Sequence, residues 1–234
     1  MRIHYLQHVP FENPGIILSW AESRKYPVTC TRLFEDDKLP AGEDFDWLVI
    51  MGGPMNIYEE ETYPWLIKEK EFIKTAISEN KLILGLCLGA QLIADVIGGK
   101  VVKNQYSEIG WFPVTFTKEA MALPQFSHFP PNPVVFEWHG DTFTDLPKES
   151  MLIATNEACR NQAFAYGKRV YGFQFHLENT RQIITDLIEN CRDEMVPGTY
   201  IQSVSEILAG KRFIDQNNQW MLQLLDKLEN LQND

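Results

Sequence analysis

The 234-residue chain lacks the features that mark secreted and membrane proteins. Its four cysteines stand far apart and form no CxxC pair, and a chain of this length does not need disulfide bonds to build a core. No stretch approaches about 18 consecutive apolar residues, and the first residues, Met1 to His8, lack the apolar run of a signal peptide. We therefore expect reduced thiols in a cytoplasmic protein that does not enter a membrane.

Basic residues are also scarce. The 21 lysines and arginines are outnumbered by 32 aspartates and glutamates, which gives a formal net charge of −11, and the basic residues form no cluster. We do not expect such a chain to bind nucleic acid or an anionic membrane. Hydrophobic residues make up 44% of the sequence and charged residues 23%, which are ordinary values for a folded globular protein and disfavour disordered or rod-like segments.

Short apolar runs alternate with helical patterns along the chain, which is typical of an α/β fold with helices on the faces of a sheet. The predicted strands are residues 2–6, 29–34, 47–51, 82–84, 111–117, 134–138, 152–155, 163–166 and 170–175. The predicted helices are residues 15–25, 65–78 and 88–97, and the pattern is helical from about residue 180. No repeat or long linker divides the chain. We expect a single domain, residues 1–234, with parallel and antiparallel strands and a helical C-terminal extension.

The last helical segment is amphipathic. Five residues share its apolar face, namely Met221, Leu224, Leu225, Leu228 and Leu231. This face is most simply part of the core, although it also suits docking onto a second copy of the chain.

The sequence Gly85-Leu86-Cys87-Leu88-Gly89 lies between a predicted buried strand and a predicted helix. In this context G-x-S-x-G forms a nucleophile elbow, with glycines at both ends because neighbouring backbone crowds the sharp turn. The N–H groups of the first helical turn favour a thiolate at Cys87, and the Leu88 N–H is placed to donate to an oxyanion. These five residues alone fit equally well a small buried cysteine at a tight turn.

His176 and Glu178 stand two residues apart at the end of a predicted strand. Side chains at this spacing point to the same face, so Glu178 can accept from one ring nitrogen of His176 while the other nitrogen takes a proton from a thiol. The pair suits a Cys–His–acid triad. Taken alone, a histidine at a strand end is more often a polar residue with ordinary hydrogen bonds.

Two glycines, Gly52 and Gly53, follow another predicted strand and precede Pro54. Glycines let backbone N–H groups approach a ligand closely, although Gly-Gly-Pro by itself is usually a tight turn. Together the three strand ends supply a nucleophile, a base with its orienting acid, and a second oxyanion donor. The combination predicts a thiol-based active site.

These motifs together resemble the class I glutamine amidotransferases, and in particular free-standing members similar to the glutaminase part of GMP synthase. The resemblance spans most of the first 180 residues. Its matching stretches are Gly52 to Met55, Pro64 to Leu66, Gly85 to Gln91, Glu108 to Trp111, Trp138 to Thr142, Gln162 to Phe164, and Gln174 to Glu178. It implies a three-layer, flavodoxin-like α/β fold with a mostly parallel central sheet.

The resemblance also implies the roles of the catalytic residues. Cys87 attacks the side-chain amide carbon of glutamine and expels ammonia with the help of His176. Glu178 orients His176, and water then cleaves the thioester. The backbone N–H groups of Gly53 and Leu88 hold the oxyanion.

For the substrate, the resemblance implies a contact from Gln91, one helical turn past Cys87, and a substrate-side loop that contains Trp138 and His139. The alternatives are that Gln91 is an exposed polar helix residue and that Trp138 and His139 are ordinary core packing. One departure from the family is Leu177, where many relatives carry proline. It concerns the rigidity of the strand end more than the chemistry.

Motifs of a synthase or a metal site are absent from the sequence. It has no Ser-Gly-Gly pyrophosphatase loop, no P-loop, no G-x-G-x-x-G, no HExxH and no paired CxxC, so we expect no cofactor and no metal. The residues after Glu178 are too few to form a synthase.

Three functions remain open from the sequence. The favoured one is hydrolysis or transfer of the γ-glutamyl amide of glutamine or of a γ-glutamyl peptide, since some free-standing relatives are γ-glutamyl peptidases. The second is a glutaminase subunit that passes ammonia to a separate synthase. The third is a non-catalytic γ-glutamyl-binding protein, which the intact triad disfavours. The expected partner is therefore a small γ-glutamyl molecule, with a synthase or a second copy of the chain as further candidates.

Overall fold

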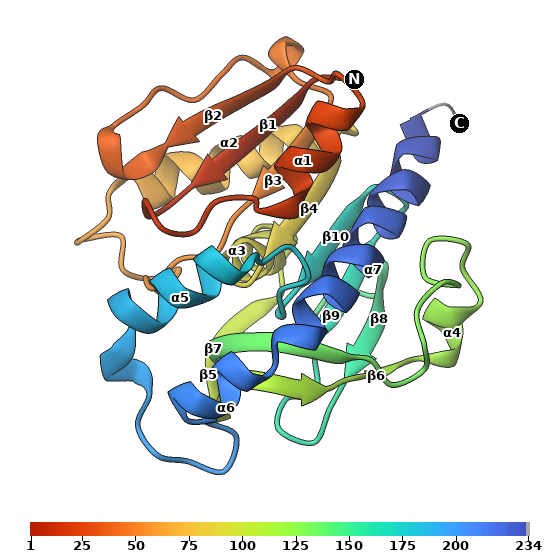
Figure 1. The fold of residues 1–234 in the computed structure, drawn as a ribbon. Coiled ribbons are helices and arrows are strands. Elements are labelled where there is room, and N and C mark those ends of the chain that lie inside the picture. Colours follow the sequence, from red (N-terminus) through yellow and green to blue (C-terminus); the bar gives the residue numbers. More distant parts are fainter. Residues whose placement is uncertain (233–234) are drawn as a thin grey trace.

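The computed structural model describes residues 1–232 and contains a large β-sheet, a small β-sheet and helices on both faces of the large one (Figure 1). The large sheet consists of β1 (Ile3–Gln7), β2 (Val28–Arg32), β3 (Trp47–Ile50), β4 (Leu82–Leu86), β6 (Thr115–Phe116), β8 (Ser150–Thr155), β9 (Ala163–Tyr166) and β10 (Val170–Phe173). Its strand order is β2-β1-β3-β4-β10-β9-β8-β6. The first five strands in this order pair in parallel and the last three pair antiparallel. The expected mixed, mostly parallel sheet is confirmed.

Helices cover both faces of the large sheet, as the α/β pattern predicts. On one face lie α1 (Ile16–Ser23) and α7 (Lys211–Glu229), and on the other lie α2 (Trp65–Ser78) and α3 (Leu88–Val96). Successive residues of β4 serve the two faces in turn, because Leu84 belongs to the core under α1 and α7 and Ile83 to the core under α2 and α3. Burial on both faces explains why β3 and β4 are uninterrupted apolar runs. The three-layer fold is thus confirmed.

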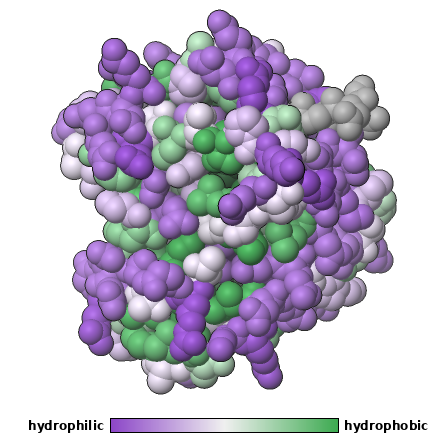
Figure 2. Space-filling model, turned by 45° about the horizontal axis from the view of Figure 1, so that its top comes forward, coloured by the Kyte–Doolittle hydropathy of each residue, from purple (hydrophilic) through white to green (hydrophobic). Residues whose placement is uncertain are grey.

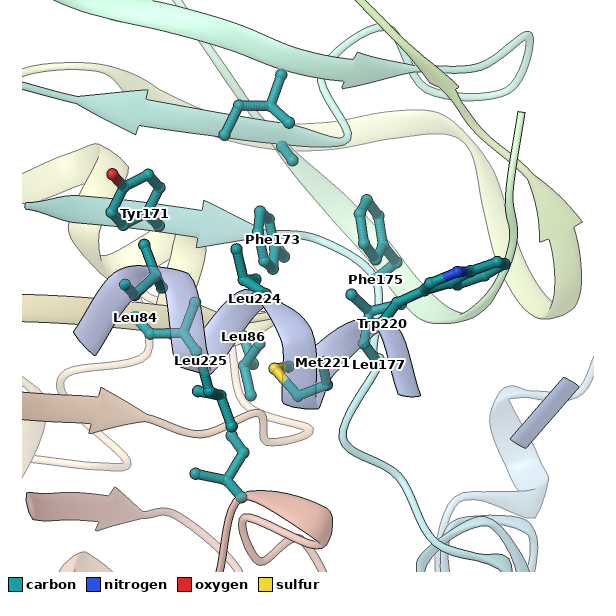
Figure 3. Close-up of a cluster of buried hydrophobic side chains, with 14 of the residues drawn as sticks. Leu84, Leu86, Tyr171, Phe173, Phe175, Leu177, Trp220, Met221, Leu224 and Leu225 are labelled. Carbon is teal, nitrogen blue, oxygen red and sulfur yellow. The ribbon is translucent and has the colours of Figure 1, made fainter. Parts of the chain in front are cut away.

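The amphipathic face of α7 packs into the core, as its pattern indicated. Met221, Leu224, Leu225 and Leu228 are fully buried, and Leu231, just beyond the helix, is partly buried against the same cluster. Figure 3 shows this face packed on side chains of β4 and β10 and on the segment that follows β10, among them Leu84, Leu86, Tyr171, Phe173, Phe175 and Leu177. The burial of Met221, Leu224, Leu225 and Leu228 makes this face part of the core.

The small sheet contains the largest difference from the sequence prediction. It pairs β5 (Lys100–Pro113) antiparallel with β7 (Val134–Thr144), and both strands extend well beyond the predicted residues 111–117 and 134–138. The predicted strand 111–117 is also divided, because β6 begins at Thr115 and belongs to the large sheet. The first half of β5 is mostly exposed and polar, so it carries no hydrophobic pattern that could identify it.

The remaining elements are short or lie near the small sheet. Helices α5 (Arg181–Asn190) and α6 (Val204–Ala209) pack against it, and α4 (Lys118–Met121) precedes β7. Short 3-10 turns occupy residues 33–35, 42–44, 192–194 and 230–232. Within the part of the chain that the structure describes, no helix has the length and apolar character needed to cross a membrane.

The order of the parallel strands fixes where the polar motifs meet. β4 and β10 are parallel neighbours, so Cys87 and His176, which follow them, lie at the same edge of the sheet. β1 and β3 are also parallel neighbours, and β3 leads into Gly52 and Gly53 at that edge. The carboxyl edge of the parallel strands is the usual position of a site in such folds.

Candidate active site

Cys87 occupies a strained turn between β4 and α3. Its φ is 51° and its ψ −109°, a backbone conformation that residues with a side chain rarely adopt. The two flanking glycines make the turn possible, because a Cβ on Gly85 would collide with the backbone of Gly89 and a Cβ on Gly89 with the backbone of Ile50. The crowding expected at a nucleophile elbow is therefore present, and strain of this kind is typical of functional positions.

The Cys87 thiol is buried and surrounded by polar groups. Its Sγ donates to the carbonyl oxygen of Trp138 at 3.4 Å, and the Gln174 amide nitrogen lies 3.7 Å from it. Burial raises the pKa of the Cys87 thiol, whereas contacts with His176 and with the Leu88 N–H oppose this rise. The sulfur is thus in contact with a histidine and with the start of a helix.

His176 and Glu178 form a close pair beside this thiol. Nδ1 of His176 lies 2.6 Å from Oε1 of Glu178, and both side chains are almost completely buried. Burial opposes a charge on the imidazole, but the Glu178 carboxylate and the contact with Cys87 raise the pKa of His176 well above its ordinary value. Because Nδ1 is bound to Glu178, Nε2 is the ring nitrogen left for the sulfur. The structure therefore brings Cys87, His176 and Glu178 together.

The segment that carries Glu178 is held from two sides. The Ile16 N–H at the start of α1 donates to the Glu178 carbonyl at 3.0 Å, and this contact is so close that a Cβ on Gly15 would overlap that oxygen. From α7, the Asn218 amide donates to the carbonyls of Leu177 and Asn179, at 2.9 and 3.0 Å. Backbone bonds on both sides of Glu178 fix its position without engaging its carboxylate.

The Leu88 N–H contacts the sulfur, and Gly53 lines the same cleft as Cys87. Leu88 is the first residue of α3, so its N–H has no partner within the helix, and it contributes a hydrogen bond that favours the Cys87 thiolate. Gly53 lies beside it, since a Cβ on Gly53 would be 3.2 Å from Cδ2 of Leu88. The two predicted oxyanion donors are therefore neighbours.

A cleft of about 410 Å³ opens onto these groups. Its lining includes Gly53, Cys87, Gln91, Trp138, His139 and His176. Figure 2 shows a molecular surface that is mostly hydrophilic, with hydrophobic residues visible mainly in the central and lower parts of the view. These lining residues are six of the eight site residues predicted from the sequence. Of the other two, Leu88 contacts the Cys87 thiol through its backbone, and Glu178 contacts His176.

Gln91 is buried, so the alternative of an exposed helix residue is wrong. Its amide nitrogen donates to the Asp141 carbonyl and to Oε1 of Gln174, each at 3.2 Å. Gln174 in turn faces the Cys87 sulfur. Gln91 therefore lines the cleft and is also connected to the thiol through one intervening side chain.

Trp138 and His139 lie in the cleft wall, but both side chains are engaged with the protein. The Trp138 indole N–H donates to Glu194 at 3.0 Å. Nδ1 of His139 lies 2.9 Å from the Asp141 carbonyl and Nε2 lies 3.0 Å from Glu108. The His139 ring thus points into a polar cluster rather than toward free space in the cleft.

That cluster is the one group of side chains among the described residues with metal-ligand spacing. Potential ligand atoms of Glu108, His139 and Cys159 lie within 4.8 Å of one another and are buried. Glu108 already accepts hydrogen bonds from Asn156 and Gln162, at 2.6 and 2.8 Å. Because other side chains of the protein already hydrogen-bond to Glu108, a buried hydrogen-bond network is enough to explain the cluster.

Sequence reasoning missed two polar side chains that follow β1. Glu12 lines the cleft, and burial raises its pKa to about 7 despite the nearby His176 and His8. His8 is completely buried and contacts the carbonyl of Gly52. The sequence could have indicated these two residues, because they follow a predicted strand, as the other predicted site residues do. That strand, β1, is parallel to β3.

Comparisons with known proteins relate this chain to glutamine amidotransferases. The sequence model of the family described as glutamine amidotransferase class-I matches residues 16–193. The chain is 34% identical over 235 residues to the glutamine amidotransferase-like protein YfeJ of Salmonella typhimurium, with 97% of each chain covered. A solved structure of a glutamine amidotransferase from Thermotoga maritima has a TM-score of 0.87 and 30% identity, and covers 97% of both chains.

Two further relatives have named activities. One subunit of the glutamine-hydrolyzing GMP synthase of Picrophilus torridus is 34% identical over 155 residues, which is 64% of this chain and 78% of that protein. Gamma-glutamyl peptidase 3 of Arabidopsis thaliana is 26% identical over 161 residues, which is 66% of this chain and 64% of that protein.

Proposed function

The chain belongs to the class I glutamine amidotransferase family, and we propose that it hydrolyses the γ-glutamyl amide of glutamine or of a γ-glutamyl compound through a thioester on Cys87. The observation that carries this proposal is the 2.6 Å contact between His176 and Glu178 beside the strained, buried thiol. A nucleophile, a base in contact with it and an acid that orients the base are the parts that thiol catalysis requires.

In the first half of the reaction, the Cys87 sulfur attacks the amide carbon and its proton passes to Nε2 of His176. The two groups titrate as a coupled unit, because each affects the pKa of the other. The amide oxygen becomes an oxyanion, to which the N–H groups of Gly53 and Leu88 donate. The C–N bond then breaks, His176 returns the proton to the leaving nitrogen, and ammonia or an amine departs.

In the second half, water attacks the thioester carbon and His176 takes its proton. The same two N–H groups receive the second oxyanion. The C–S bond breaks, the proton returns to sulfur, and glutamate is released. Glu178 remains in place throughout, holds the ring in one orientation and stabilises the imidazolium that forms twice.

The acidic side chains of the cleft favour a substrate that carries an ammonium group. Glu12, Asp141 and Glu194 line it, and Lys103 is a basic residue among the lining side chains. The α-amino group of a γ-glutamyl compound provides such a positive charge, whereas an internal glutamine of a polypeptide does not. We propose that these carboxylates and Gln91 distinguish a free γ-glutamyl group from a side chain within a protein.

The experiment that tests the proposal is an incubation of the purified chain with glutamine, glutathione and a panel of γ-glutamyl compounds. Ammonia, glutamate and the released amine are followed together. We expect cleavage of at least one compound by the wild-type chain and none by Cys87→Ala. Absence of cleavage across the whole panel by the isolated chain would contradict an independent hydrolase.

The runner-up function is a glutaminase subunit that passes ammonia to a separate synthase. The similarity to one subunit of a GMP synthase supports it. In this case the isolated chain hydrolyses glutamine slowly and a synthase accelerates it, which separates the two proposals in the same assay. A non-catalytic binding role predicts instead that Cys87 does not react with an electrophile that mimics glutamine.

The proposed compartment is the cytoplasm. The mechanism depends on a reduced thiol at Cys87, and thiols persist under the reducing conditions found there. All four cysteines of the chain are free in the structure, in agreement with this environment.

A further inference from the structure

His8 lies where two parallel strands of the large sheet end side by side. β1 and β3 pair in parallel, and beyond β3 the Met51 N–H still donates to the Leu6 carbonyl at 3.1 Å. The register therefore continues past the strand and brings His8 opposite Gly52. The histidine reaches this position because of the sheet topology, while 44 residues separate the two in the sequence.

The imidazole of His8 connects the glycine turn to helix α2. Nδ1 lies 3.0 Å from the Gly52 carbonyl oxygen, Nε2 lies 2.8 Å from Oε1 of Glu69, and neither side chain is exposed. A carbonyl oxygen can only accept, so Nδ1 carries a proton. Nε2 faces a carboxylate, and although burial opposes a charge, Glu69 raises the pKa of His8. Nδ1 thus donates to Gly52, while Nε2 and the Glu69 carboxyl share a proton.

The Gly52 carbonyl and the Gly53 N–H belong to one planar trans peptide, so they point in opposite directions. When His8 holds the oxygen on one side, the N–H must point to the other. Gly53 lines the cleft together with Cys87, and neither glycine has a side chain that could hold the peptide plane by packing. The hydrogen bond from His8 to the oxygen also polarises the peptide and strengthens its N–H as a donor.

We infer that His8, held by Glu69, is a positioning residue that fixes the Gly52–Gly53 peptide with its N–H directed at the oxyanion. This role rests on the proposed function, in which Gly53 is one of the two oxyanion donors. His8 contacts the peptide and Glu69 contacts His8, so both act on the reaction through that peptide alone. A purely structural pair would affect the stability of the fold and leave the oxyanion unaffected.

Two substitutions of His8 separate its two contacts. His8→Asn places an amide nitrogen near the position of Nδ1 and retains a donor to Gly52, whereas His8→Gln reaches the position of Nε2 and retains only the contact with Glu69. We expect His8→Gln to lower kcat about 100-fold, the scale of a lost oxyanion donor, and His8→Asn to lower it less than about 10-fold. Glu69→Gln, with an intermediate loss, tests the same role if the His8 variants do not fold.

The matched control is His4, a second buried histidine, located within β1. Its ring nitrogens contact the hydroxyls of Thr29 and Thr31, at 2.7 and 3.0 Å, away from the cleft. We expect His4→Asn and His4→Gln to lower the Tm and to leave kcat unchanged. A kcat for His8→Gln that equals that of a His4 variant with the same Tm would overturn the inference.

Two reagents distinguish a lost oxyanion donor from a damaged thiol. The γ-aldehyde analogue of glutamine adds to Cys87 and converts its carbonyl oxygen into an oxyanion, so His8→Gln should bind it about 100-fold more weakly. Iodoacetamide alkylates the sulfur and expels iodide without forming an oxyanion, so its rate should stay within about twofold of wild type. Equal losses with both reagents would mean that His8 supports the thiol itself and would contradict the inference.

Failure of the proposed function is recognised separately, by a wild-type chain that cleaves no γ-glutamyl compound. The orientation of the peptide remains measurable in that case. Crystal structures of the wild type and of His8→Gln should show the Gly52–Gly53 peptide rotated in the variant and retained in His4→Gln. An unrotated peptide in His8→Gln would overturn the inference whatever the activity.

Discussion

The Gln91 amide nitrogen donates a 3.2 Å hydrogen bond to Oε1 of Gln174 and so links the first turn of α3 to the segment that leads to His176. Gln174 directs its own amide toward the Cys87 sulfur. A residue expected to contact substrate is thereby coupled to the nucleophile, which determines how its removal should be measured.

Gln91→Ala should raise KM for the preferred γ-glutamyl substrate and lower kcat to a smaller extent. A hydrogen bond to a charged group contributes about 1.5–3 kcal/mol, and it is present in the ground state and the transition state alike. Steady-state kinetics checks this, with Gln182→Ala on α5 as the control. An unchanged KM with a large fall in kcat would mean that Gln91 acts only by placing Gln174 and Cys87.

Cys87→Ala should abolish amide cleavage while the free energy of unfolding changes by about 1 kcal/mol or less, because only one sulfur atom is lost from a turn. The comparison is Cys30→Ala, a half-buried cysteine on β2, which should retain full activity. Turnover is measured as glutamate release and stability by urea unfolding. Residual cleavage by Cys87→Ala above the uncatalysed rate would remove the thioester mechanism.

Glu178→Gln should slow turnover by up to about 10,000-fold, less than Cys87→Ala. Glutamine can still accept from Nδ1 of His176, but it lacks the negative charge that raises the pKa of that imidazole. Alkylation by iodoacetamide near pH 7 should slow as well, because the imidazolium that accompanies the thiolate is less stable. Glu189→Gln on α5 is the control, and an unchanged rate in Glu178→Gln would place Glu178 outside the triad.

Glu12→Gln should stabilise the protein in a pH-dependent manner. Burial raises the pKa of Glu12 to about 7 in the folded state, from an ordinary value of 4.5. As the pH rises between these values, the unfolded state releases the proton first, so the wild type loses stability. The advantage of Glu12→Gln over wild type should therefore grow by about 3 kcal/mol between pH 4.5 and pH 8.

Urea unfolding at the two pH values measures this difference. Glu61→Gln, at an exposed position, is the control for the removal of one negative charge. An advantage that is the same at both pH values would show that the Glu12 carboxyl titrates alike in the folded and unfolded chains.

The sequence predicted the parts of the site that follow from strand ends. Cys87 and His176 each follow a run of buried apolar residues, and the edge of a parallel sheet is where polar residues at such positions meet. The motif spacing could not indicate that β4 and β10 are neighbours, since that order depends on packing of the whole sheet. The resemblance to a family supplied this information.

The rejected alternative and the omission have local physical causes. An exposed Gln91 was the alternative because glutamine is usually exposed, but residues 88–94 of α3 are all buried, and the helix has no solvent face at this point. The pairing of His8 with Glu69 spans 61 residues and involves a strand end and a helix face. No periodicity of either segment points to the other, so this contact appears only in the folded chain.

The Asn218 side chain donates hydrogen bonds to the backbone on both sides of Glu178, and it belongs to a helix that is synthesised after the rest of the site. A ribosome completes β1 to β10 before it makes α7, so a nascent chain can contain every residue of the proposed triad and still lack the clamp that fixes its acid. The contacts of Asn218 with this segment therefore require α7 to be docked on β4 and β10.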